Sequence, residues 1–206
     1  MGSFVAAVRP RLGVLGGSFD PPHLGHLVIA SEACARFALE RVLFVPAAAP
    51  PHKDPGHRTT AAARLAMTEL AVERDPRFQV LGLEIERDLV YTRDTVQAVA
   101  DLFPEHDLVF IMGSDSLLQL EAWHDPDGIL AICRLVVALR PGDDPGAVAA
   151  AARRWGSGCV SLMEAPLVGI SSSAVRARVA AGLTIRYLVP SAVEEYARQH
   201  DLYRQT

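Results

Sequence analysis

The sequence lacks the features that mark membrane proteins and nucleic-acid-binding proteins. No run of apolar residues is long enough to cross a bilayer, although 50% of the 206 residues are hydrophobic. Basic residues are not in excess, because the formal net charge is −4 and the pI is close to 6.0, so no positive field is available to hold nucleic acid. Internal repeats and low-complexity linkers are also missing, and residues 1–206 fit a single domain. These absences favour a soluble protein whose partners are small molecules.

Cysteine is scarce as well. The three cysteines, Cys34, Cys133 and Cys159, are odd in number, far apart and without C-x-x-C spacing. This pattern predicts reduced core thiols in a cytoplasmic protein. The apolar patch within Met1–Arg11 spans only a few residues and has no cleavage-site pattern, so we expect residues 1–10 to form a loose tail and not a signal peptide.

The motifs of several common enzyme classes are also missing. A dinucleotide-binding fingerprint needs G-x-G-x-x-G, but counting from Gly13 places Leu15 and Ser18 where the second and third glycines belong. The Gly-Lys-Ser/Thr sequence of a P-loop does not occur, and neither does the G-x-S-x-G of a nucleophile elbow. Without an evident activated nucleophile, direct transfer between two substrates is favoured over a covalent enzyme intermediate.

The most informative stretch covers residues 16–26, which read Gly-Gly-Ser-Phe-Asp-Pro-Pro-His-Leu-Gly-His. It follows the apolar run Leu12–Leu15 and precedes a periodic apolar pattern, which predicts a strand, a glycine turn and the start of a helix. Gly16 and Gly17 have no Cβ, so an anion can approach their N–H groups closely. The helix start adds unpaired N–H donors and the positive end of the helix dipole. The stretch therefore predicts a phosphate site.

Two histidines extend this predicted site. His23 and His26 are three residues apart across the helix start, so their rings should lie on one side of the first turn and bracket a single phosphoryl group. An isolated H-x-x-H pair is more often a pair of surface histidines or a chance metal pair.

The rest of the chain alternates between apolar runs and helical patterns. We expect an α/β fold with a Rossmann-like, doubly wound parallel sheet, in which binding loops meet at the carboxyl edge where the strand order reverses. Residues 170–206 should form a helical C-terminal portion of the same domain. The further strands that we expect are Val42–Val45, Phe78–Leu83, Leu108–Met112, Leu135–Leu139 and Cys159–Met163.

Three loops carry further candidate groups. Ser172, Ser173 and Arg176 converge at a helix start and predict a second anion site, although a serine-capped helix with a surface arginine fits the same pattern. His52 and Lys53 lie in a proline-rich loop and could donate to phosphate or simply be solvated. Gly113 and Asp115 follow a buried strand, where the Asp115 carboxylate could accept from a ribose hydroxyl, cap a helix, or do both.

Two of these motifs resemble a known superfamily. Residues 16–26 resemble the G-G-S/T-F-D-P-x-H-x-G-H signature of the HxGH nucleotidyltransferases, and residues 170–176 resemble their I-S-S-T-x-x-R motif, with Ser173 in place of Thr. The chain from Leu12 to Tyr203 is further similar to the bacterial nicotinate-nucleotide adenylyltransferases. That similarity is carried by Pro50–Lys53, Tyr91–Thr92, Gly113–Ser116, Trp123 and the tail from Tyr187 to Tyr203.

The resemblance implies a reaction and a set of site residues. The 5′-phosphate of nicotinate mononucleotide would attack the α-phosphorus of ATP, releasing pyrophosphate and forming nicotinate adenine dinucleotide for NAD biosynthesis. Mg²⁺ would be carried by the ATP phosphates without a dedicated protein cage. The resemblance implies catalytic roles for His23 and His26, acceptor contacts from Thr92 and Trp123, and ATP contacts from Gly17, Ser18, Phe19, His52, Lys53, Gly113, Asp115, Ser172, Ser173 and Arg176.

Several points of the sequence leave alternatives open. Residues 87–90 read Arg-Asp-Leu-Val where many family members have Gly-Gly-Pro-Ser, and His124 occupies a position that is often aromatic. Tryptophan is more often a core residue than a ligand contact, so Trp123 could belong to the core. A phosphopantetheine adenylyltransferase and a non-catalytic nucleotide-sensing module remain the competing functions. The sequence does not decide between the acid and the amide mononucleotide, or whether the chain forms a homo-oligomer.

Overall fold

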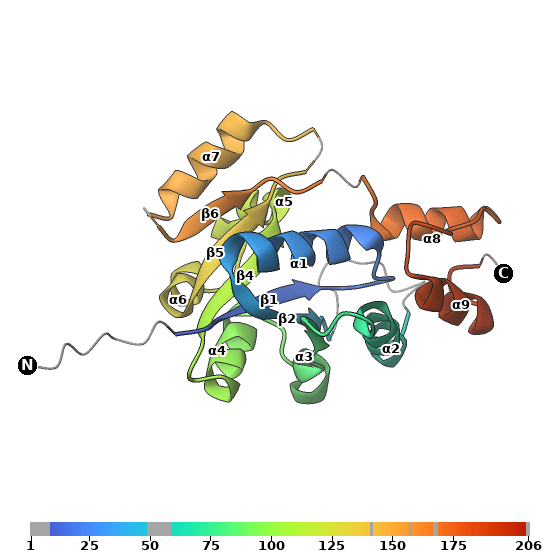
Figure 1. Ribbon diagram of the computed structural model, residues 1–206. Helices are drawn as coiled ribbons and strands as arrows, with labels where there is room; N and C mark the ends of the chain where they lie inside the picture. The colour runs from blue at the N-terminus through green and yellow to red at the C-terminus, as the bar shows by residue number, and fades with distance from the viewer. Residues whose placement is uncertain (1–8, 49–58, 141, 157, 167–168, 205–206) are drawn as a thin grey trace, which may run out of the picture.

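The structure, a computed structural model, describes residues 9–48, 59–140, 142–156, 158–166 and 169–204. Within these residues the strands form one parallel sheet in the order β3-β2-β1-β4-β5-β6, which confirms the predicted Rossmann-like, doubly wound architecture (Figure 1). The chain runs outward from β1 to β3, crosses to β4 and runs outward again to β6. The strands are β1 (Arg11–Gly17), β2 (Leu39–Pro46), β3 (Phe78–Val80), β4 (Asp107–Gly113), β5 (Cys133–Ala138) and β6 (Val160–Met163).

The central strands are buried on both faces, which explains their continuous apolar sequences. In β4, Leu108, Phe110 and Met112 point to one side of the sheet, while Val109 and Ile111 point to the other. The first side packs against α3 (Leu83–Arg87), α4 (Thr92–Leu102), α5 (Ser114–Leu118), α6 (Pro126–Ile132) and α7 (Pro145–Arg154). The second side packs against α1 (Leu24–Phe37) and the end of α2 (Ala61–Val72).

The helices α2, α6, α7 and α8 begin where a capping side chain occurs in the sequence. The hydroxyl of Thr60 accepts from the N–H of Ala63 over 3.2 Å at the start of α2. The carboxylate of Asp125 accepts from the N–H of Gly128 over 3.0 Å at the start of α6. Such caps satisfy N–H groups that have no partner within the first helical turn.

The last two helices are α8 (Ser172–Ala180) and α9 (Ser191–Gln199), and they confirm that the C-terminal portion is helical. Both lie at the end of the sheet toward which β1 points (Figure 1). Val175, Val193 and neighbouring apolar residues pack against Met67 of α2 in a third core cluster. The C-terminal portion is thereby held at the carboxyl edge of the sheet, where binding loops are expected.

Four predicted features need correction. Gly16 and Gly17 do not form a turn, because both belong to β1 and pair with Val45 and Pro46 of β2. The strand expected at Phe78–Leu83 ends at Val80, because Gly82 caps α3 and Leu83 packs into the core as a helical residue. Asp115 does not cap a helix, since Gly113 is the N-cap of α5 and Asp115 lies one residue inside the helix. Cys34 and Cys133 are buried core thiols as predicted, but Cys159 is only partly buried.

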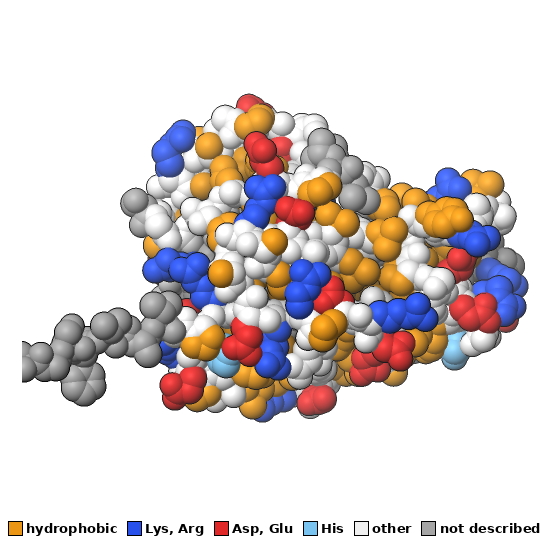
Figure 2. Space-filling model, viewed as in Figure 1, with side chains coloured by type: hydrophobic (Ala, Val, Ile, Leu, Met, Phe, Trp, Pro, Cys, Tyr) orange, Lys and Arg blue, Asp and Glu red, His pale blue; other side chains and the backbone are white. Residues whose placement is uncertain are grey.

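The surface has charges of both signs. Acidic and basic side chains are interspersed over the face seen in Figure 2, so no broad field of one sign covers it. None of the described helices combines the length and apolarity needed to span a membrane. Most of the predicted N-terminal tail, residues 1–8, lies outside the described residues, and Arg9 and Pro10 are exposed just before β1.

Candidate active site

Two histidine rings stack at the start of α1. His23 is the N-cap residue, His26 is in the first turn, and their ring centroids lie 3.7 Å apart with an angle of 25° between the planes. The backbone N–H of His23 donates to Nδ1 of His26 over 3.1 Å. Because Nδ1 accepts, the ring proton of neutral His26 is on Nε2, which makes Nε2 a donor. The prediction that both rings lie on one side of the first turn is confirmed.

Glycines around the pair leave room for the rings. A Cβ on Gly25 would lie 3.0 Å from Cε1 and Nδ1 of His23, closer than side chains normally approach. A Cβ on Gly17 would lie 3.2 Å from the ring of Phe19. That ring in turn meets His26 edge to face, with the centroids 5.0 Å apart. The spacing of the first motif therefore follows from packing, because Gly25 admits the His23 ring and Gly17 admits the Phe19 ring.

The environment of His23 favours its neutral form. The residue is 7% exposed, and burial together with the positive charge of Arg140 lowers its pKa from 6.5 to about 4. At neutral pH the ring is an uncharged hydrogen-bonding group. Positive charge beside His23 must therefore come from other groups, including Arg140.

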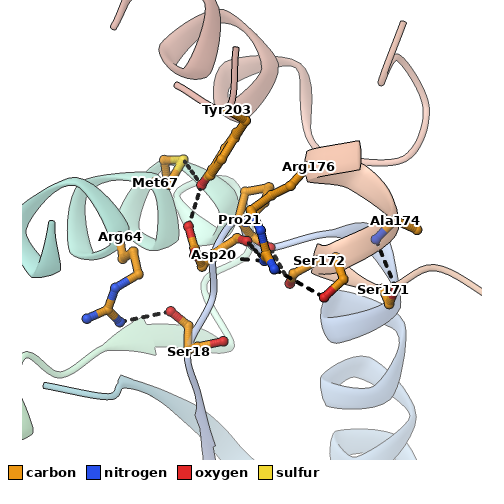
Figure 3. A network of polar contacts seen from close by, with 11 residues as sticks. Ser18, Asp20, Pro21, Arg64, Met67, Ser171, Ser172, Ala174, Arg176 and Tyr203 are labelled. Atoms are coloured by element: carbon orange, nitrogen blue, oxygen red, sulfur yellow. Dashed lines mark hydrogen bonds and ion pairs between the residues drawn. The ribbon is translucent and has the colours of Figure 1, made fainter. Parts of the chain in front are cut away.

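The start of α8 lies directly on the loop that joins β1 to α1 (Figure 3). The hydroxyl of Ser172 donates to the carbonyl of Pro21 over 2.9 Å, and Nη1 of Arg176 donates to the carbonyl of Asp20 over 2.7 Å. Nη2 of Arg176 also reaches the hydroxyl of Ser173 at 3.1 Å. The expectation that the two helix starts meet is confirmed, and their hydroxyls, N–H groups and guanidinium line one edge of the sheet.

The ends of β4 and β5 contribute an ion pair. Nη1 of Arg140 lies 3.1 Å from Oδ2 of Asp115, and both side chains are exposed. Gly113 makes this approach feasible, because a Cβ there would lie 3.0 Å from Nε of Arg140 and 2.5 Å from Oδ1 of Asp115. Arg140 was not among the residues expected from sequence. Its position directly after an apolar strand, at the carboxyl edge of a parallel sheet, is the signal that could have identified it.

A pocket of about 410 Å³ opens beside the start of α4. Thr92 and Trp123, the two residues predicted to hold the acceptor, both line it. Tyr91 and His124 stack at its wall with centroids 4.3 Å apart. Trp123 also packs against the core, where it meets Phe110 edge to face at 6.3 Å. Trp123 therefore supports the core and also lines the pocket, and its contact with the acceptor stays a prediction.

Phe110 lies between this pocket and the end of β1, where the first motif begins. A Cβ on Gly16 would lie 3.5 Å from the Phe110 ring, and the same ring contacts Trp123. One side chain of β4 thus separates the loop that carries the histidines from the pocket that holds Thr92 and Trp123. The two predicted substrate sites are neighbours.

Three residues that were not predicted from the sequence support the loop of the first motif. Asp20 is 5% exposed, and its carboxylate accepts from the hydroxyl of Tyr203 over 2.7 Å and lies 3.8 Å from Nη1 of Arg176. Arg64 of α2 donates to the carbonyl of Ser18 over 2.9 Å (Figure 3). Asp20 could have been found from its place inside the motif. Arg64 and Tyr203 carry no local pattern that distinguishes them from other arginines and tyrosines.

Two predicted residues, His52 and Lys53, lie outside the described residues. Across the described ranges, no group of three His, Cys, Asp or Glu side chains could hold a metal ion. The groups that converge here are stacked imidazoles, helix N–H donors, hydroxyls and guanidinium groups. Such a set suits a ligand with several phosphates.

Comparisons with known proteins agree with this geometry. A family model described as cytidylyltransferase-like matches residues 14–178, which include both motifs. A protein of Salinibacter ruber named probable nicotinate-nucleotide adenylyltransferase is 44% identical to this chain, and the match covers 95% of this chain and 98% of the relative. A protein of Thermomicrobium roseum with the same name is 43% identical, and the match covers 94% of this chain and 92% of the relative. The nicotinic acid mononucleotide adenylyltransferase of Plasmodium falciparum, solved with NaAD, has the same fold at 17% identity, with a TM-score of 0.78 over 94% of this chain and 97% of that one. Since the sequence identity extends over nearly the whole length, and the loop that leads to the paired histidines contacts the start of α8, this chain belongs to the nicotinate-nucleotide adenylyltransferase family.

Proposed function

We propose that the protein transfers the adenylyl group of ATP to nicotinate mononucleotide, releasing pyrophosphate and forming nicotinate adenine dinucleotide for NAD biosynthesis. The observation that carries this proposal is the stacked pair His23 and His26, which follows a loop that the bond from Ser172 to Pro21 joins to the start of α8. The names of the relatives support nicotinate mononucleotide as the acceptor of the adenylyl group. The Plasmodium structures, one with NaAD and one with APC, support nucleotide ligands for this fold.

Adenylyl transfer requires that the protein position the two substrates and stabilise the charge that develops between them. The second pKa of a phosphate monoester is about 6, so the attacking 5′-phosphate is already largely dianionic at neutral pH and needs no general base. The protein must bring two anions together and stabilise the charge that develops on the transferred phosphorus and on the leaving pyrophosphate.

We assign the catalytic role to the histidine pair. Nε2 of His26 is a donor and would contact an oxygen of the α-phosphate in the transition state. His23 is neutral and would donate or accept without adding charge. Backbone N–H groups of Gly17, Ser18 and Phe19, at the turn before α1, would contact the same region of ATP.

We assign the binding of the ATP triphosphate to cationic and hydroxyl groups around the histidine pair. Arg176 would exchange its carbonyl contact for phosphate oxygens, since it already lies on the motif loop and bonds the hydroxyl of Ser173. Ser172 would act with it from the start of α8. His52 and Lys53 are proposed as further donors to the triphosphate.

The acceptor would occupy the pocket beside α4. The indole of Trp123 offers a flat face to the electron-poor pyridine ring, and Thr92 offers a hydroxyl and the N-terminal end of a helix. Gly113 and Asp115, at the end of β4, would contact the ribose of the nucleotide. Phe110 keeps this pocket next to the end of β1, which would bring the two substrates together.

We propose that Mg²⁺ enters with ATP. Magnesium prefers phosphate oxygens and water, and it is commonly held by the substrate with few protein ligands. The buried Asp20 is committed to Tyr203 and Arg176, and Asp115 to Arg140, so these carboxylates are more suited to positioning than to forming a metal cage. We also propose a cytoplasmic location, in which the buried thiols of Cys34 and Cys133 remain reduced.

The deciding experiment measures pyrophosphate release from MgATP with nicotinate mononucleotide, nicotinamide mononucleotide, phosphopantetheine and flavin mononucleotide. We expect strong turnover with nicotinate mononucleotide and a loss in kcat of about 100-fold in His26→Ala, because a donor aimed at the transition state contributes that much. Turnover with phosphopantetheine instead would overturn the assignment of nicotinate mononucleotide as the acceptor. No turnover with any acceptor, combined with tight ATP binding, would leave a nucleotide-sensing module.

A further inference from the structure

Arg64 is an unusually buried cation that belongs to neither motif. It lies in the first half of α2 and is only 2% exposed. A buried arginine is costly unless its donors find acceptors, so its retention in the core points to a specific task. Its two terminal nitrogens each donate over 2.9 Å to a main-chain carbonyl, Nη1 to Ser18 and Nη2 to Ala48.

The two carbonyls belong to two different loops at the carboxyl edge of the sheet. Ser18 follows β1, and Ala48 follows the neighbouring strand β2. Ala48 is also held on its other side, because its N–H bonds to the carboxylate of Glu84. A second bond, from the N–H of Ala47 to the carbonyl of Gly17 over 2.9 Å, joins the loop after β2 to the last residue of β1. Two consecutive carbonyls at the end of β1 are therefore held in place, that of Gly17 by a backbone N–H and that of Ser18 by Arg64.

The bond to the Ser18 carbonyl holds the peptide group that precedes a strained residue, Phe19. Phe19 has a φ of 45°, a left-handed conformation that an aromatic residue adopts only when its surroundings enforce it. The carbonyl of Ser18 and the N–H of Phe19 belong to one planar peptide group. Holding that carbonyl fixes the orientation of the peptide plane from which φ of Phe19 is measured.

Phe19 in turn supports the catalytic pair. Its ring is 1% exposed and meets His26 edge to face, with centroids 5.0 Å apart, and His26 stacks on His23. A continuous set of contacts thus runs from the guanidinium of Arg64 through the Ser18–Phe19 peptide to the two imidazoles. Figure 3 shows the first contact of this series, with Arg64 reaching from α2 to Ser18 behind the motif loop.

We propose that Arg64 is a positioning residue for adenylyl transfer: it holds the Ser18–Phe19 peptide in the orientation that keeps the Phe19 ring against His26. This role rests on the proposed function of the histidine pair. Arg64 does not touch the substrates, because its side chain is buried and both terminal nitrogens are used within the protein. The planar fork of a guanidinium suits the task, since it reaches two separate carbonyls with fixed geometry.

The test compares Arg64→Ala and Arg64→Lys with the matched control Thr68→Val. Thr68 lies one turn further along α2, is fully buried, and donates from Oγ1 to the carbonyl of Arg64 over 2.7 Å. Its replacement perturbs the same helix and core without removing the guanidinium. Arg64→Lys keeps a positive charge and most of the apolar stem, so it serves if Arg64→Ala does not fold.

We expect both Arg64 variants to lower kcat by about tenfold or more, because small displacements of reacting groups are that costly. The KM for nicotinate mononucleotide should change much less, since Thr92 and Trp123 lie on other elements. Thr68→Val should keep wild-type kcat. A wild-type kcat in a folded Arg64 variant, or an equal loss in Thr68→Val, would overturn the proposal.

A second readout needs no substrate. The imidazole proton signals of His23 and His26, followed by NMR in the full-length protein without ligands, should shift in the Arg64 variants and stay in place in Thr68→Val. Unchanged histidine signals in a folded Arg64 variant would overturn the positioning role. If the wild-type protein does not form nicotinate adenine dinucleotide, the proposed function fails, whereas the NMR comparison still decides whether Arg64 positions the pair.

Discussion

The hydroxyl of Tyr203 donates a 2.7 Å hydrogen bond to Oδ1 of Asp20, across 183 residues of sequence. Asp20 belongs to the loop that carries the histidine pair, and Tyr203 lies four residues after the end of α9. The carboxylate of Asp20 is buried and also faces Arg176, and the main-chain carbonyl of Asp20 accepts from the same arginine. The C-terminal tail is therefore part of the support of the candidate active site.

Replacing Tyr203 with Phe should destabilise the protein. The change removes a donor from a buried carboxylate, which costs about 1–3 kcal/mol when the acceptor cannot reach water. Burial and the negative charge of Asp20 raise the pKa of Tyr203, so the hydroxyl stays protonated over the working pH range. Urea unfolding at pH 7 measures the difference. Tyr187→Phe is the control, because Tyr187 is 77% exposed, and an equal loss in both variants would contradict the prediction.

Acid should weaken the folded state through His23. Its pKa is about 4 in the folded protein and 6.5 in the unfolded chain, so between these values the unfolded chain binds the extra proton. Unfolding free energy should therefore be constant above pH 6.5 and fall between pH 6.5 and 4, by roughly 3 kcal/mol from this residue. Urea unfolding of His23→Gln should show a flatter pH dependence in that window. His124→Gln, at an exposed position, should keep the wild-type slope, and a wild-type slope in His23→Gln would contradict the assignment.

Substituting Gly25 with Ala should impair catalysis more than folding. The added Cβ would lie 3.0 Å from the His23 ring and push it away from its position against His26. We expect a kcat lower by about tenfold, because the cost comes from a small misplacement of the pair. Gly146→Ala is a matched control, since Gly146 is also the second residue of its helix and lies in α7. Steady-state kinetics on both variants, with thermal melting curves, separates the two effects.

Replacing Trp123 with Ala should raise the KM for nicotinate mononucleotide by about tenfold or more, since an aromatic stacking partner is lost. The KM for ATP should change far less. Trp155→Ala controls for lost core packing, because Trp155 packs against the same cluster from the end of α7 and lies outside the pocket. If both tryptophan variants alter the two KM values equally, Trp123 acts only through the core.

Lys53 permits a selective labelling experiment, because it is the only lysine in the sequence. An amine-specific reagent can modify this side chain and the α-amino group, and peptide mass spectrometry distinguishes the two sites. MgATP should protect Lys53 and leave the α-amino group reactive, if Lys53 donates to the triphosphate. Equal labelling with and without MgATP would remove Lys53 from the ATP site.

Much of the fold could be predicted from local sequence. The apolar runs that became β1, β2, β4 and β5 are continuous because both faces of these strands are buried, and the caps at Thr60 and Asp125 mark helix starts. The first error came at β3, where an apolar run continues past the strand into α3. Periodicity cannot separate these elements over so few residues, and the end of an edge strand depends on its neighbour.

In the candidate site, too, the local features could be predicted from sequence and the contacts between distant residues could not. The stacking of His23 and His26 follows from their spacing at a helix start, and Gly25 between them is required by the ring that it admits. These features are local, so consecutive residues are enough to specify them.

The positions of Arg64, Arg140 and Tyr203 were decided only by the tertiary structure. Each acts on a group far away in the sequence: Arg64 on Ser18, Arg140 on Asp115, and Tyr203 on Asp20. An arginine on a helix or a tyrosine in a tail has the same local pattern whether it faces solvent or a buried carbonyl. What makes them important is which elements the sheet order and the C-terminal helices bring together. The sequence by itself thus determined the central strands and the histidine pair, and the packing of distant elements decided where β3 ends and what supports that pair.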